Sequence, residues 1–318
     1  MDANVDLSSK EFAEAVRTGL LATPKSISSM YFYDDRGSEL FQAISRHPDY
    51  YLTSTEHSIL TANADAIFSS IDCTELDVVE LGAGDGHKTQ ILLNAFAQHG
   101  NSISYYPIDI SAEAIRLLED GLELPANVQL NPIVADHFGG LDEIGEESNR
   151  TKLVLFLGSS IGNFNREDTI NFLKEIGSHL RAGDFLLLGF DLKKDITRLV
   201  RAYNDEAGLT EAFNKNLLTR INRELGANFN PESFQHFGTY NPVLGAMESY
   251  LVSDSAQTVE IAALEVSVSF DAWEPIHLEY SFKFSIEDID YFAEQSNFTV
   301  IDNFIDLDAL FCDSLWRR

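Results

Sequence analysis

The chain has 318 residues, of which 44% are hydrophobic, and its 22 basic and 51 acidic side chains give a formal net charge of −29. A chain of this length and hydrophobicity can bury one large core or two smaller ones. The charge argues against nucleic acid and anionic membranes as partners, because binding to polyanions depends on Lys and Arg neutralising phosphates. The acidic residues are scattered along the chain, which is typical of a solvated surface.

Targeting signals and metal-ligand spacings are absent from the sequence. No apolar run approaches the ~20 residues that span a bilayer, and residues 1–6 lack the basic and apolar regions of a secretory signal. Cys73 and Cys312 are far apart, and the eight histidines form no pair at ligand spacing. We therefore expect a cytoplasmic protein with no membrane partner, no metal site and no disulfide framework, and we take a monomer as the default.

The first two thirds of the chain alternate between helical and apolar segments. Residues 1–57 carry helical patterns, and Thr53 with Glu56 has the spacing of a helix-capping box. After residue 58, short apolar runs alternate with amphipathic segments up to residue 195. The runs expected to form strands are Leu76–Leu81, Ile103–Ile110, Val128–Val134, Leu153–Leu157 and Phe185–Phe190. The alternation predicts a doubly wound parallel sheet that binds ligands at the C-terminal ends of its strands.

The remainder of the chain has a different pattern. A helix is expected over Leu209–Leu225, then a loop from Gly226 to Gly245 that is rich in Asn, Pro and Gly, then strands. Residues 298–304 and Leu310–Trp316 are expected to form a C-terminal β-hairpin. The predicted fold class is α/β, with a Rossmann-like domain over 58–195 and 286–318 and a second, α+β lobe over 1–57 and 196–285.

A glycine turn follows the first strand of the predicted sheet. The apolar run Val78–Leu81 leads into Gly82, Gly84 and Gly86, and a helical pattern follows. Glycine suits a turn that needs positive φ and bare backbone beside a ligand, and the start of a helix offers free N–H donors. Asp109 lies 23 residues after Gly86, where a second parallel strand would end and a carboxylate can accept both ribose hydroxyls. The sequence therefore predicts a nucleotide-like cofactor.

The spacing of this turn narrows the class of cofactor. The pattern Gly-x-Gly-x-Gly and the short strand end Tyr106-Pro-Ile-Asp-Ile-Ser111 resemble S-adenosylmethionine-dependent methyltransferases more than dehydrogenases. An NAD-dependent oxidoreductase is the competing hypothesis. A non-catalytic cofactor-binding protein is a further alternative.

The segment Ile276–Phe284 alternates with a period of two. One face, expected to be core, has Ile276, Leu278, Tyr280, Phe282 and Phe284, and the other has His277, Glu279, Ser281 and Lys283. Glu279 and Ser281 would project to the same side, ~6–7 Å apart at a rise of ~3.3 Å per residue. Two acceptors at that separation suit a small planar group with two N–H donors, such as a protonated imidazole. A solvent-facing edge of an antiparallel sheet is the alternative.

Segments spread over most of the chain, in order, resemble the bacterial and fungal L-histidine Nα-methyltransferases of ergothioneine biosynthesis. These segments are 31–41, 48–56, the glycine turn, 156–164, 187–195, 203–205, 213–217, 222–227 and 279–284. The resemblance implies S-adenosylmethionine as cofactor, an amino acid as small-molecule substrate, and transfer of methyl groups to its α-amine by in-line displacement, ending in a trimethylated product.

The resemblance also implies a role for each matching residue. Around the cofactor, Gly82, Gly84 and Lys88 would line the methionine and ribose part, Asp109 would hold the ribose hydroxyls, and Asp136 would accept from the adenine amino group. Around the acceptor, Tyr33 would orient the amine as the catalytic residue, Tyr50, Asn163 and Tyr203 would grip the carboxylate, and Glu279 with Ser281 would read the imidazole. Taken singly, each has a structural alternative: packing tyrosines, a turn asparagine, a surface lysine, and a helix cap at Asp136.

Ser249 departs from the family pattern, in which a methionine commonly occupies this place. A small hydroxyl in place of a thioether changes the volume and polarity of the acceptor pocket, so another aromatic amino acid, such as a tryptophan derivative, is the alternative acceptor. Glu279 and Ser281 favour histidine, because an indole would leave a hydrogen-bonding pair without its partner.

Overall fold

The structure is a computed structural model, and it describes residues 3–145 and 150–318. The chain divides into two compact units. Unit 1 comprises Met1–Tyr50 and Asp195–Ser281, and unit 2 comprises Tyr51–Lys194 and Phe282–Arg318. These limits lie near, but not at, the domain limits expected from the sequence. The first falls before residue 57, because helix α3 (Tyr51–Ile71) packs against elements of unit 2.

Unit 2 is built around a mixed sheet, which is eight-stranded over the described residues. The strand order is β13-β14-β7-β6-β2-β3-β4, and β5 pairs with β3. Strands β2 to β7 pair in parallel, whereas β14 is antiparallel to both β7 and β13. The strands are β2 Glu75–Leu81, β3 Ser102–Asp109, β4 Val128–Leu130, β5 Ile133–Val134, β6 Thr151–Phe156, β7 Phe185–Asp191, β13 Thr299–Ile305 and β14 Phe311–Arg317. The predicted α/β class, with its doubly wound sheet and C-terminal hairpin, is confirmed.

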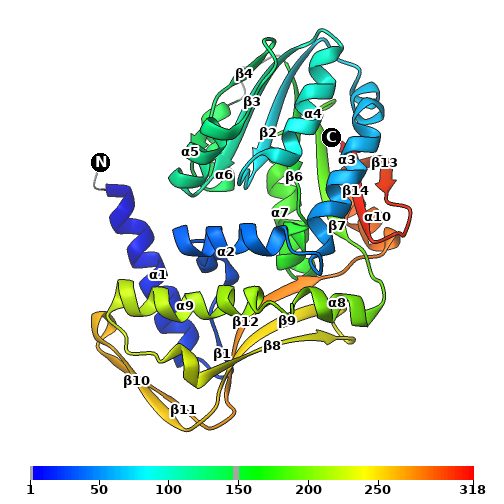
Figure 1. Cartoon of the computed structure of the whole chain (residues 1–318). Coiled ribbons are helices and arrows are strands. Elements are labelled where there is room, and N and C mark those ends of the chain that lie inside the picture. Colours follow the sequence, from blue (N-terminus) through cyan, green and yellow to red (C-terminus); the bar gives the residue numbers. More distant parts are fainter. Residues whose placement is uncertain (1–2, 146–149) are drawn as a thin grey trace. The chain divides into compact units, whose positions relative to one another are not determined.

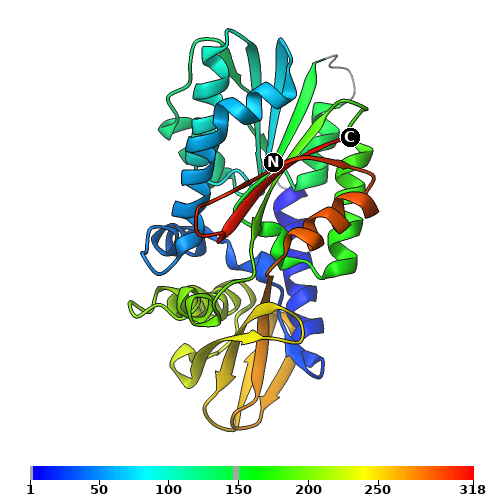
Figure 2. The ribbon, with the colours of Figure 1, turned by 90° about the vertical axis from the view of Figure 1, so that its right-hand side faces the viewer.

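Helices cover both faces of this sheet, with α3 and α4 on one face and α7 and α10 on the other (Figures 1 and 2). Besides α3, the helices of unit 2 are α4 His87–Gln98, α5 Ala112–Gly121, α6 His137–Ile144, the short η2 Ser160–Asn163, α7 Arg166–Ser178 and α10 Ile286–Gln295. All seven residues of β7 are buried, as expected for a parallel strand that is covered on both sides. The apolar core therefore runs along the central strands, and the strand ends are left for ligands.

One predicted strand of the sheet is interrupted. The run Val128–Val134 forms two short strands, β4 and β5, instead of one. Pro132 lies in the gap, and proline has no N–H to donate to a ladder. Both pieces still pair with β3.

Unit 1 combines helices with small sheets. Its helices are α1 Ala3–Leu21, η1 Ser29–Phe32, α2 Asp35–Ser45, α8 Ile196–Ala202, α9 Leu209–Leu225, η3 Pro231–Ser233 and η4 Ala262–Leu264. Its strands are β1 Lys25–Ser26, β8 Phe234–Asn241, β9 Ala246–Ser253, β10 Gln257–Ile261, β11 Val266–Phe270 and β12 Pro275–Phe282, whose last residue belongs to unit 2. They form one sheet of order β1-β12-β9-β8 and the separate pair β10-β11. The predicted helix Leu209–Leu225 is confirmed, with left-handed glycines at both ends.

The expectation of a loop over residues 226–245 is wrong for part of that segment. Strand β8 lies within it and pairs antiparallel with β9. Most of the Asn, Pro and Gly residues that suggested a loop lie on either side of β8, where they form turns, whereas Gly238 and Asn241 lie within the strand. Within β8, Phe234 is fully buried and supplies the apolar anchor that composition alone concealed.

The expected faces of the segment Ile276–Phe284 are wrong at Tyr280, Ser281 and Lys283, whereas Phe284 is buried as predicted and Phe282 packs against the core. Ile276 and Leu278 are buried as predicted, but Tyr280 is 37% exposed while Ser281 and Lys283 are 5% and 2% exposed. The Tyr280 ring lies 4.1 Å from the ring of His277. Ser281 and Lys283 tolerate burial because each has a polar partner, the Tyr203 hydroxyl and the Asp191 carboxylate respectively. Polar side chains are therefore buried beside the predicted aromatic core at this end of the segment, and Tyr280 is the aromatic residue that lies outside it.

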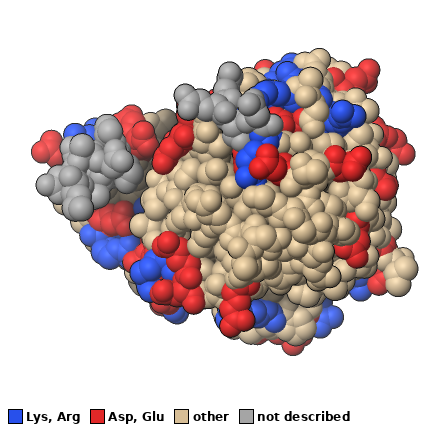
Figure 3. Space-filling view, turned by 90° about the horizontal axis from the view of Figure 1, so that it is seen from above, with Lys and Arg blue, Asp and Glu red and all other residues tan. Residues whose placement is uncertain are grey.

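The hydropathy of the helices and the charge of the surface are relevant to membranes and nucleic acids as possible partners. Across residues 3–145 and 150–318, no helix is both long and apolar enough to cross a membrane. On the face seen in Figure 3, acidic and basic side chains lie dispersed around an uncharged area. That face has no continuous basic patch among its described residues, which agrees with the strongly negative net charge.

Candidate active site

The glycine turn after β2 has the backbone conformation that the sequence predicted. Gly82, Gly84 and Gly86 have φ of 71°, 55° and 67°, a region that side-chain-bearing residues rarely adopt. The Gly82 N–H donates to the Ile108 carbonyl at 2.8 Å, which ties the turn to β3. A Cβ on Gly84 would meet nothing within 4 Å, whereas one on Gly86 would lie 3.0 Å from Leu118. Gly84 therefore leaves bare backbone open to a ligand, and Gly86 allows close packing.

Asp109 ends β3 beside this turn. Its Oδ2 accepts from the Gly84 N–H at 3.0 Å and its Oδ1 accepts from the Ser111 N–H at 2.9 Å. Each oxygen of a carboxylate has a second lone pair, so a ribose diol can bind without breaking either bond. The structure thus brings together two predicted cofactor residues, Gly84 and Asp109.

Asp136 lies at the end of the neighbouring strand, β5. The Ala135 N–H donates to the Asp109 carbonyl at 3.1 Å, so the two acidic residues follow adjacent strands. Asp136 caps α6 through its Oδ1, which accepts from the Gly139 N–H at 2.7 Å. The capping role is thus present, and the exposed side chain has a second oxygen for the predicted contact with adenine.

Lys88 lies in the first turn of α4 and pairs with Glu56, at 2.5 Å between Nζ and Oε2. Burial lowers the pKa of Lys88, but Glu56 outweighs burial and raises it above the usual value. The other oxygen of Glu56 accepts from the Gly158 N–H at 2.6 Å. The predicted cap of Thr53 and Glu56 is wrong, because α3 begins at Tyr51 and Glu56 lies inside it. Contact between Lys88 and the cofactor stays a prediction.

Further acidic residues are buried around Glu56. Burial, followed by the Glu56 carboxylate, raises the pKa of Asp313 well above its usual value. Burial also raises the pKa of Glu80 to about 7. A Cβ on Gly189 would lie 2.5 Å from Glu56 Oε1, so a side chain at this position would displace the Glu56 carboxylate. Sequence reasoning missed this arrangement, because its members come from four distant segments.

A second turn follows β6, the neighbour of β2 in the sheet. Gly158 and Ser159 have φ of 77° and 59°, and η2 then ends at Asn163, whose side chain is exposed. Because β2 and β6 are parallel, their C-terminal ends meet at one edge of the sheet, where the strand order reverses. Asn163 and the glycine turn therefore lie at the same edge of unit 2.

In unit 1, two of the predicted acceptor residues belong to one aromatic cluster. The Tyr33 and Tyr50 rings lie 5.6 Å and 6.1 Å from the ring of Phe41, and Tyr33 lies 5.7 Å from Phe213. Tyr33 is 39% exposed. Aromatic faces attract cationic ammonium groups, so the cluster suits an amino-acid amine. Phe41 and Phe213 were not predicted, since apolar residues in helical segments indicate only core.

Two further acceptor residues contact each other in unit 1. The Tyr203 hydroxyl donates to Ser281 Oγ at 2.7 Å. Both side chains are buried, and Glu279, two residues before Ser281 in β12, is half-buried. Tyr203, which was predicted to bind the substrate carboxylate, is thus hydrogen-bonded to Ser281, which was predicted to bind the imidazole.

His236 is hydrogen-bonded to the main chain of Tyr203. Its Nε2 donates to the Tyr203 carbonyl at 2.9 Å, and its Nδ1 accepts from Asn214 Nδ2 at 3.0 Å. Both bonds together require the neutral imidazole with its proton on Nε2. The sequence did not predict this role of His236, because its partners Asn214 and Tyr203 are 22 and 33 residues away and no spacing rule connects them.

We expect His236 to make stability depend on pH. Burial lowers the pKa of His236, so its contribution is complete above the unfolded value of about 6.5 and is lost as pH falls through the folded value. In urea unfolding between pH 5 and 8, His236→Gln should flatten the decrease on the acidic side. The matched control is His57→Gln, an exposed histidine of α3. An identical pH profile for His236→Gln and wild type would contradict this role.

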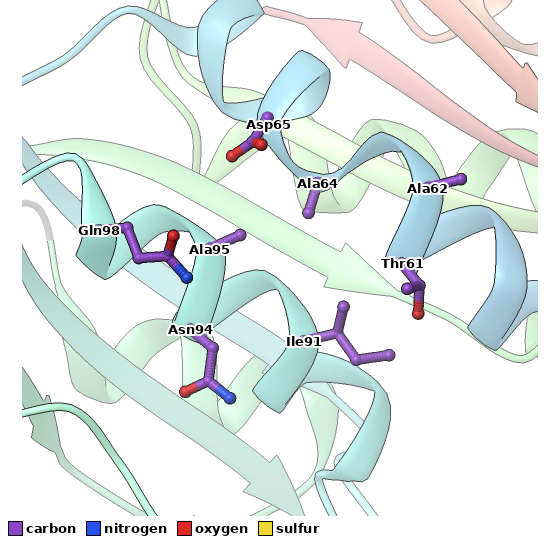
Figure 4. A pocket seen from close by; sticks show the side chains of 8 residues that line it. All are labelled: Thr61, Ala62, Ala64, Asp65, Ile91, Asn94, Ala95 and Gln98. Atoms are coloured by element: carbon purple, nitrogen blue, oxygen red, sulfur yellow. The ribbon is translucent and has the colours of Figure 1, made fainter.

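A separate pocket of about 330 Å³ lies between α3 and α4. Figure 4 shows its side chains projecting from these two helices, and most of them are small or uncharged. They are Thr61, Ala62, Ala64, Asp65, Ile91, Asn94, Ala95 and Gln98. None of the predicted site residues lines it. Within the described residues, moreover, no group of three His, Cys, Asp or Glu could hold a metal ion.

A doubly wound sheet with an antiparallel C-terminal hairpin, a glycine turn at the point of strand reversal and a carboxylate on the next strand define the class of S-adenosylmethionine-dependent methyltransferases. A family model described as histidine-specific methyltransferase, SAM-dependent, matches residues 12–318. The chain belongs to this family. Its cofactor class is therefore S-adenosylmethionine, as predicted, and the oxidoreductase and non-catalytic hypotheses are set aside.

Individual relatives agree with the family. The chain is 40% identical over 270 residues to a histidine N-alpha-methyltransferase of Mycobacterium tuberculosis, covering 85% of this chain and 83% of the relative. It is 39% identical over 289 residues to the protein of that name from Mycolicibacterium smegmatis, covering 89% and 88%. A 4-dimethylallyltryptophan N-methyltransferase of Claviceps purpurea is 29% identical over 262 residues, covering 75% of each chain.

Proposed function

We propose that this protein transfers methyl groups from S-adenosylmethionine to the α-amino group of L-histidine. The observation that carries the choice of acceptor is the arrangement in unit 1 of Glu279 close in sequence to the bonded pair of Ser281 and Tyr203. A carboxylate and a hydroxyl match the two nitrogens of an imidazole, whereas an indole has only one N–H. Two relatives of similar length that are named for histidine support the same choice.

Unit 2 has the residues that would hold the cofactor. The open backbone at Gly84 gives room for it, Asp109 would accept the ribose hydroxyls, and Asp136 would accept from the adenine amino group. Gly82 and Lys88 would lie beside the methionine moiety of the cofactor. S-adenosylmethionine supplies an electrophilic methyl group on a sulfonium, so the protein needs no covalent nucleophile of its own.

The acceptor residues would orient the amine and keep its lone pair accessible. Tyr50, Asn163 and Tyr203 would bind the carboxylate, Glu279 and Ser281 the imidazole, and Tyr33 the amine. Fixing both ends of the substrate would leave the nitrogen little freedom, and positioning of this kind supplies much of the acceleration in displacement reactions. The Tyr33 ring can also accept an amine that loses N–H donors with each methylation, because a ring face attracts a quaternary ammonium.

Ser249 supports a second candidate acceptor. It is 1% exposed in β9, opposite Gly238 of β8, and Gly238 donates its N–H to Asn204, the neighbour of Tyr203. A small residue here enlarges the space beside the acceptor residues, and one relative is named for a tryptophan derivative. An N-methyltransferase of a tryptophan derivative is therefore the alternative.

A mass-spectrometric screen tests the proposal. The purified protein is incubated with S-adenosylmethionine and each amino acid in turn, with tryptophan and 4-dimethylallyltryptophan included. We expect histidine to gain up to three methyl groups. Methylation of another amino acid while histidine stays unmodified would refute the choice of acceptor and leave the chemistry intact.

Tyr33→Phe tests the role of the hydroxyl near the amine. We expect at least one methylation step to slow by about tenfold, the usual order for one hydrogen bond that aligns a reacting group, so mono- or dimethylhistidine should accumulate. Time courses of the product masses provide the measurement, and Tyr31→Phe, a neighbouring half-buried tyrosine, is the control. Wild-type progress through all steps would count against Tyr33.

The setting of the enzyme is part of the proposal. A monomer in the cytoplasm, with a free amino acid as substrate and without nucleic-acid or membrane partners, is consistent with the net charge of −29. Size-exclusion chromatography with light scattering would test the monomer.

A further inference from the structure

Asp191, the last residue of β7, is the centre of a buried ionic cluster in unit 2. Its side chain is fully buried. The Tyr51 hydroxyl lies 2.8 and 2.9 Å from its two carboxylate oxygens, and Lys283 Nζ lies 2.8 Å from Oδ2. Lys194 pairs with Oδ1 and also donates to the Tyr51 hydroxyl at 2.8 Å. One carboxylate thus binds three side chains from three separate segments.

These three side chains stand beside the three places where the chain passes between the units. Tyr51 is the first residue of unit 2 after Tyr50, Lys194 is the last before Asp195, and Lys283 is the second after Ser281. The Asp191 carboxylate therefore anchors every crossing of the chain on its unit 2 side. Two of the crossings begin at Tyr50 and Ser281, both of which have acceptor roles in the proposed function.

The backbone of Asp191 extends the same connections. Its N–H donates to Ser159 Oγ at 2.8 Å, and Ser159 has the left-handed backbone conformation that starts the turn to Asn163. Its carbonyl accepts from the Phe284 N–H at 3.0 Å, which fixes the chain directly after Lys283. Asp191 thus contacts Tyr51, Lys283 and Ser159, which lie one, two and four residues in sequence from Tyr50, Ser281 and Asn163 respectively.

This cluster is expensive to bury. Removing ions from water costs several kcal/mol each, and the attraction within a pair seldom exceeds that cost. Burial lowers the pKa of Lys194 to about 8 in spite of the adjacent Asp191. The effect of burial on the Lys194 ammonium therefore exceeds the effect of its partner. Strand β7 is already paired on both sides, with β6 and β14, so the sheet does not need these ions. The presence of these buried ion pairs is explained if they hold the chain in one conformation at the three places where it passes from one unit to the other.

We propose that Asp191 is a positioning residue for the amino-acid acceptor, which fixes Tyr50 through Tyr51, Ser281 through Lys283, and Asn163 through Ser159. The inference rests on the proposed function, because these three residues have their acceptor roles only there. The contacts of Asp191 given above do not include a predicted cofactor residue, since those residues lie in the turn after β2, in α4, at the end of β3 and after β5. Acceptor binding and cofactor binding should therefore respond differently to its loss.

Asp191→Asn is the direct test. Two charge-assisted interactions weaken, and each is commonly equivalent to about a tenfold change in a binding constant. We expect KM for histidine to rise by at least about tenfold, and calorimetric Kd for S-adenosylhomocysteine to stay within about twofold of wild type. The unchanged Kd also shows that unit 2 is folded.

Tyr51→Phe is the milder variant, because the ring keeps its volume and only the hydroxyl is removed. We expect KM for histidine to rise about three- to tenfold, with kcat changed less than KM. Tyr105→Phe is the matched control: Tyr105 is also buried in unit 2, and its hydroxyl donates to the buried Glu80 carboxylate. The control should leave KM for histidine unchanged.

Two results would overturn the inference. The first is equal weakening of histidine and S-adenosylhomocysteine binding in Tyr51→Phe, which would indicate a general structural role. The second is wild-type KM for histidine in an Asp191→Asn protein that still binds S-adenosylhomocysteine. Failure of the wild-type protein to methylate histidine would instead refute the proposed function, so the two failures are distinguishable.

Discussion

Glu279→Ala is expected to remove most of the activity toward histidine. A hydrogen bond between a charged carboxylate and an N–H contributes about 1.5–3 kcal/mol, so its loss lowers kcat/KM for histidine by about 10- to 150-fold. Glu279→Gln, which keeps one acceptor oxygen, should fall between Ala and wild type. Steady-state kinetics with histidine as the varied substrate provide the measurement.

The specificity of the Glu279 effect needs a control in the same unit. Glu260 lies in β10, is exposed, and bonds to the Ser267 hydroxyl of the paired strand. Glu260→Gln therefore changes a strand carboxylate away from the acceptor residues and should leave kcat/KM unchanged. Undiminished turnover of histidine by Glu279→Ala would remove the basis for imidazole recognition and favour the alternative acceptor.

Asp109→Asn is expected to affect the cofactor more strongly than any other single change in unit 2. Both carboxylate oxygens already accept main-chain N–H groups, and an amide can accept only at its oxygen, so its NH2 would face a donor. Two ribose hydroxyl contacts of ~1.5 kcal/mol or more would weaken together. The Kd for S-adenosylhomocysteine should rise at least about 100-fold in calorimetry.

Asp120 supplies the comparison for Asp109. It is an exposed aspartate near the end of α5, where it pairs with Arg116. Asp120→Asn makes the same chemical change in the same unit and should not alter Kd for S-adenosylhomocysteine. A wild-type Kd in Asp109→Asn would show that the ribose binds elsewhere.

The cofactor part of the molecule was predictable because its signals are local. A strand, a glycine turn and a helix are consecutive in sequence, and the next parallel strand must end beside them. Gly84 and Asp109, both predicted to contact the cofactor, lie in hydrogen-bonding contact with each other. Lys88 shows the limit of such reasoning, because its partner Glu56 comes from an earlier helix and no spacing rule connects the two.

Most of the predicted acceptor residues were accessible only through resemblance to a family, and the exception is Glu279 with Ser281, which alternation placed on one side of a strand. Tyr203 and Ser281 are bonded across a sequence separation of 78 residues, and periodicity cannot reveal such a pair. Alternation along β12 even indicated the wrong face for Tyr280, because polar partners from other segments stabilise the burial of Ser281 and Lys283. Side-chain pairing across the tertiary structure outweighed the local pattern at this place.

Composition misled in two other segments for opposite reasons. Residues 226–245 contain enough turn formers to conceal β8, although Phe234 is fully buried there. The apolar content of Val128–Val134 suggested one strand, although Pro132 interrupts it. Both errors concern how a ladder of hydrogen bonds begins and ends, which depends on the partner strand.

The division of each unit into two separate segments of the chain limits how acceptor preference can change in evolution or engineering. Recombination at a single point cannot exchange unit 1 between relatives, because Met1–Tyr50 and Asp195–Ser281 are separated by most of unit 2. A functional chimera would need three junctions, and each would fall within two residues of a partner of Asp191. Under the proposed function, we therefore expect point substitutions inside unit 1, at positions such as Ser249, to be the simplest route to a different amino-acid substrate.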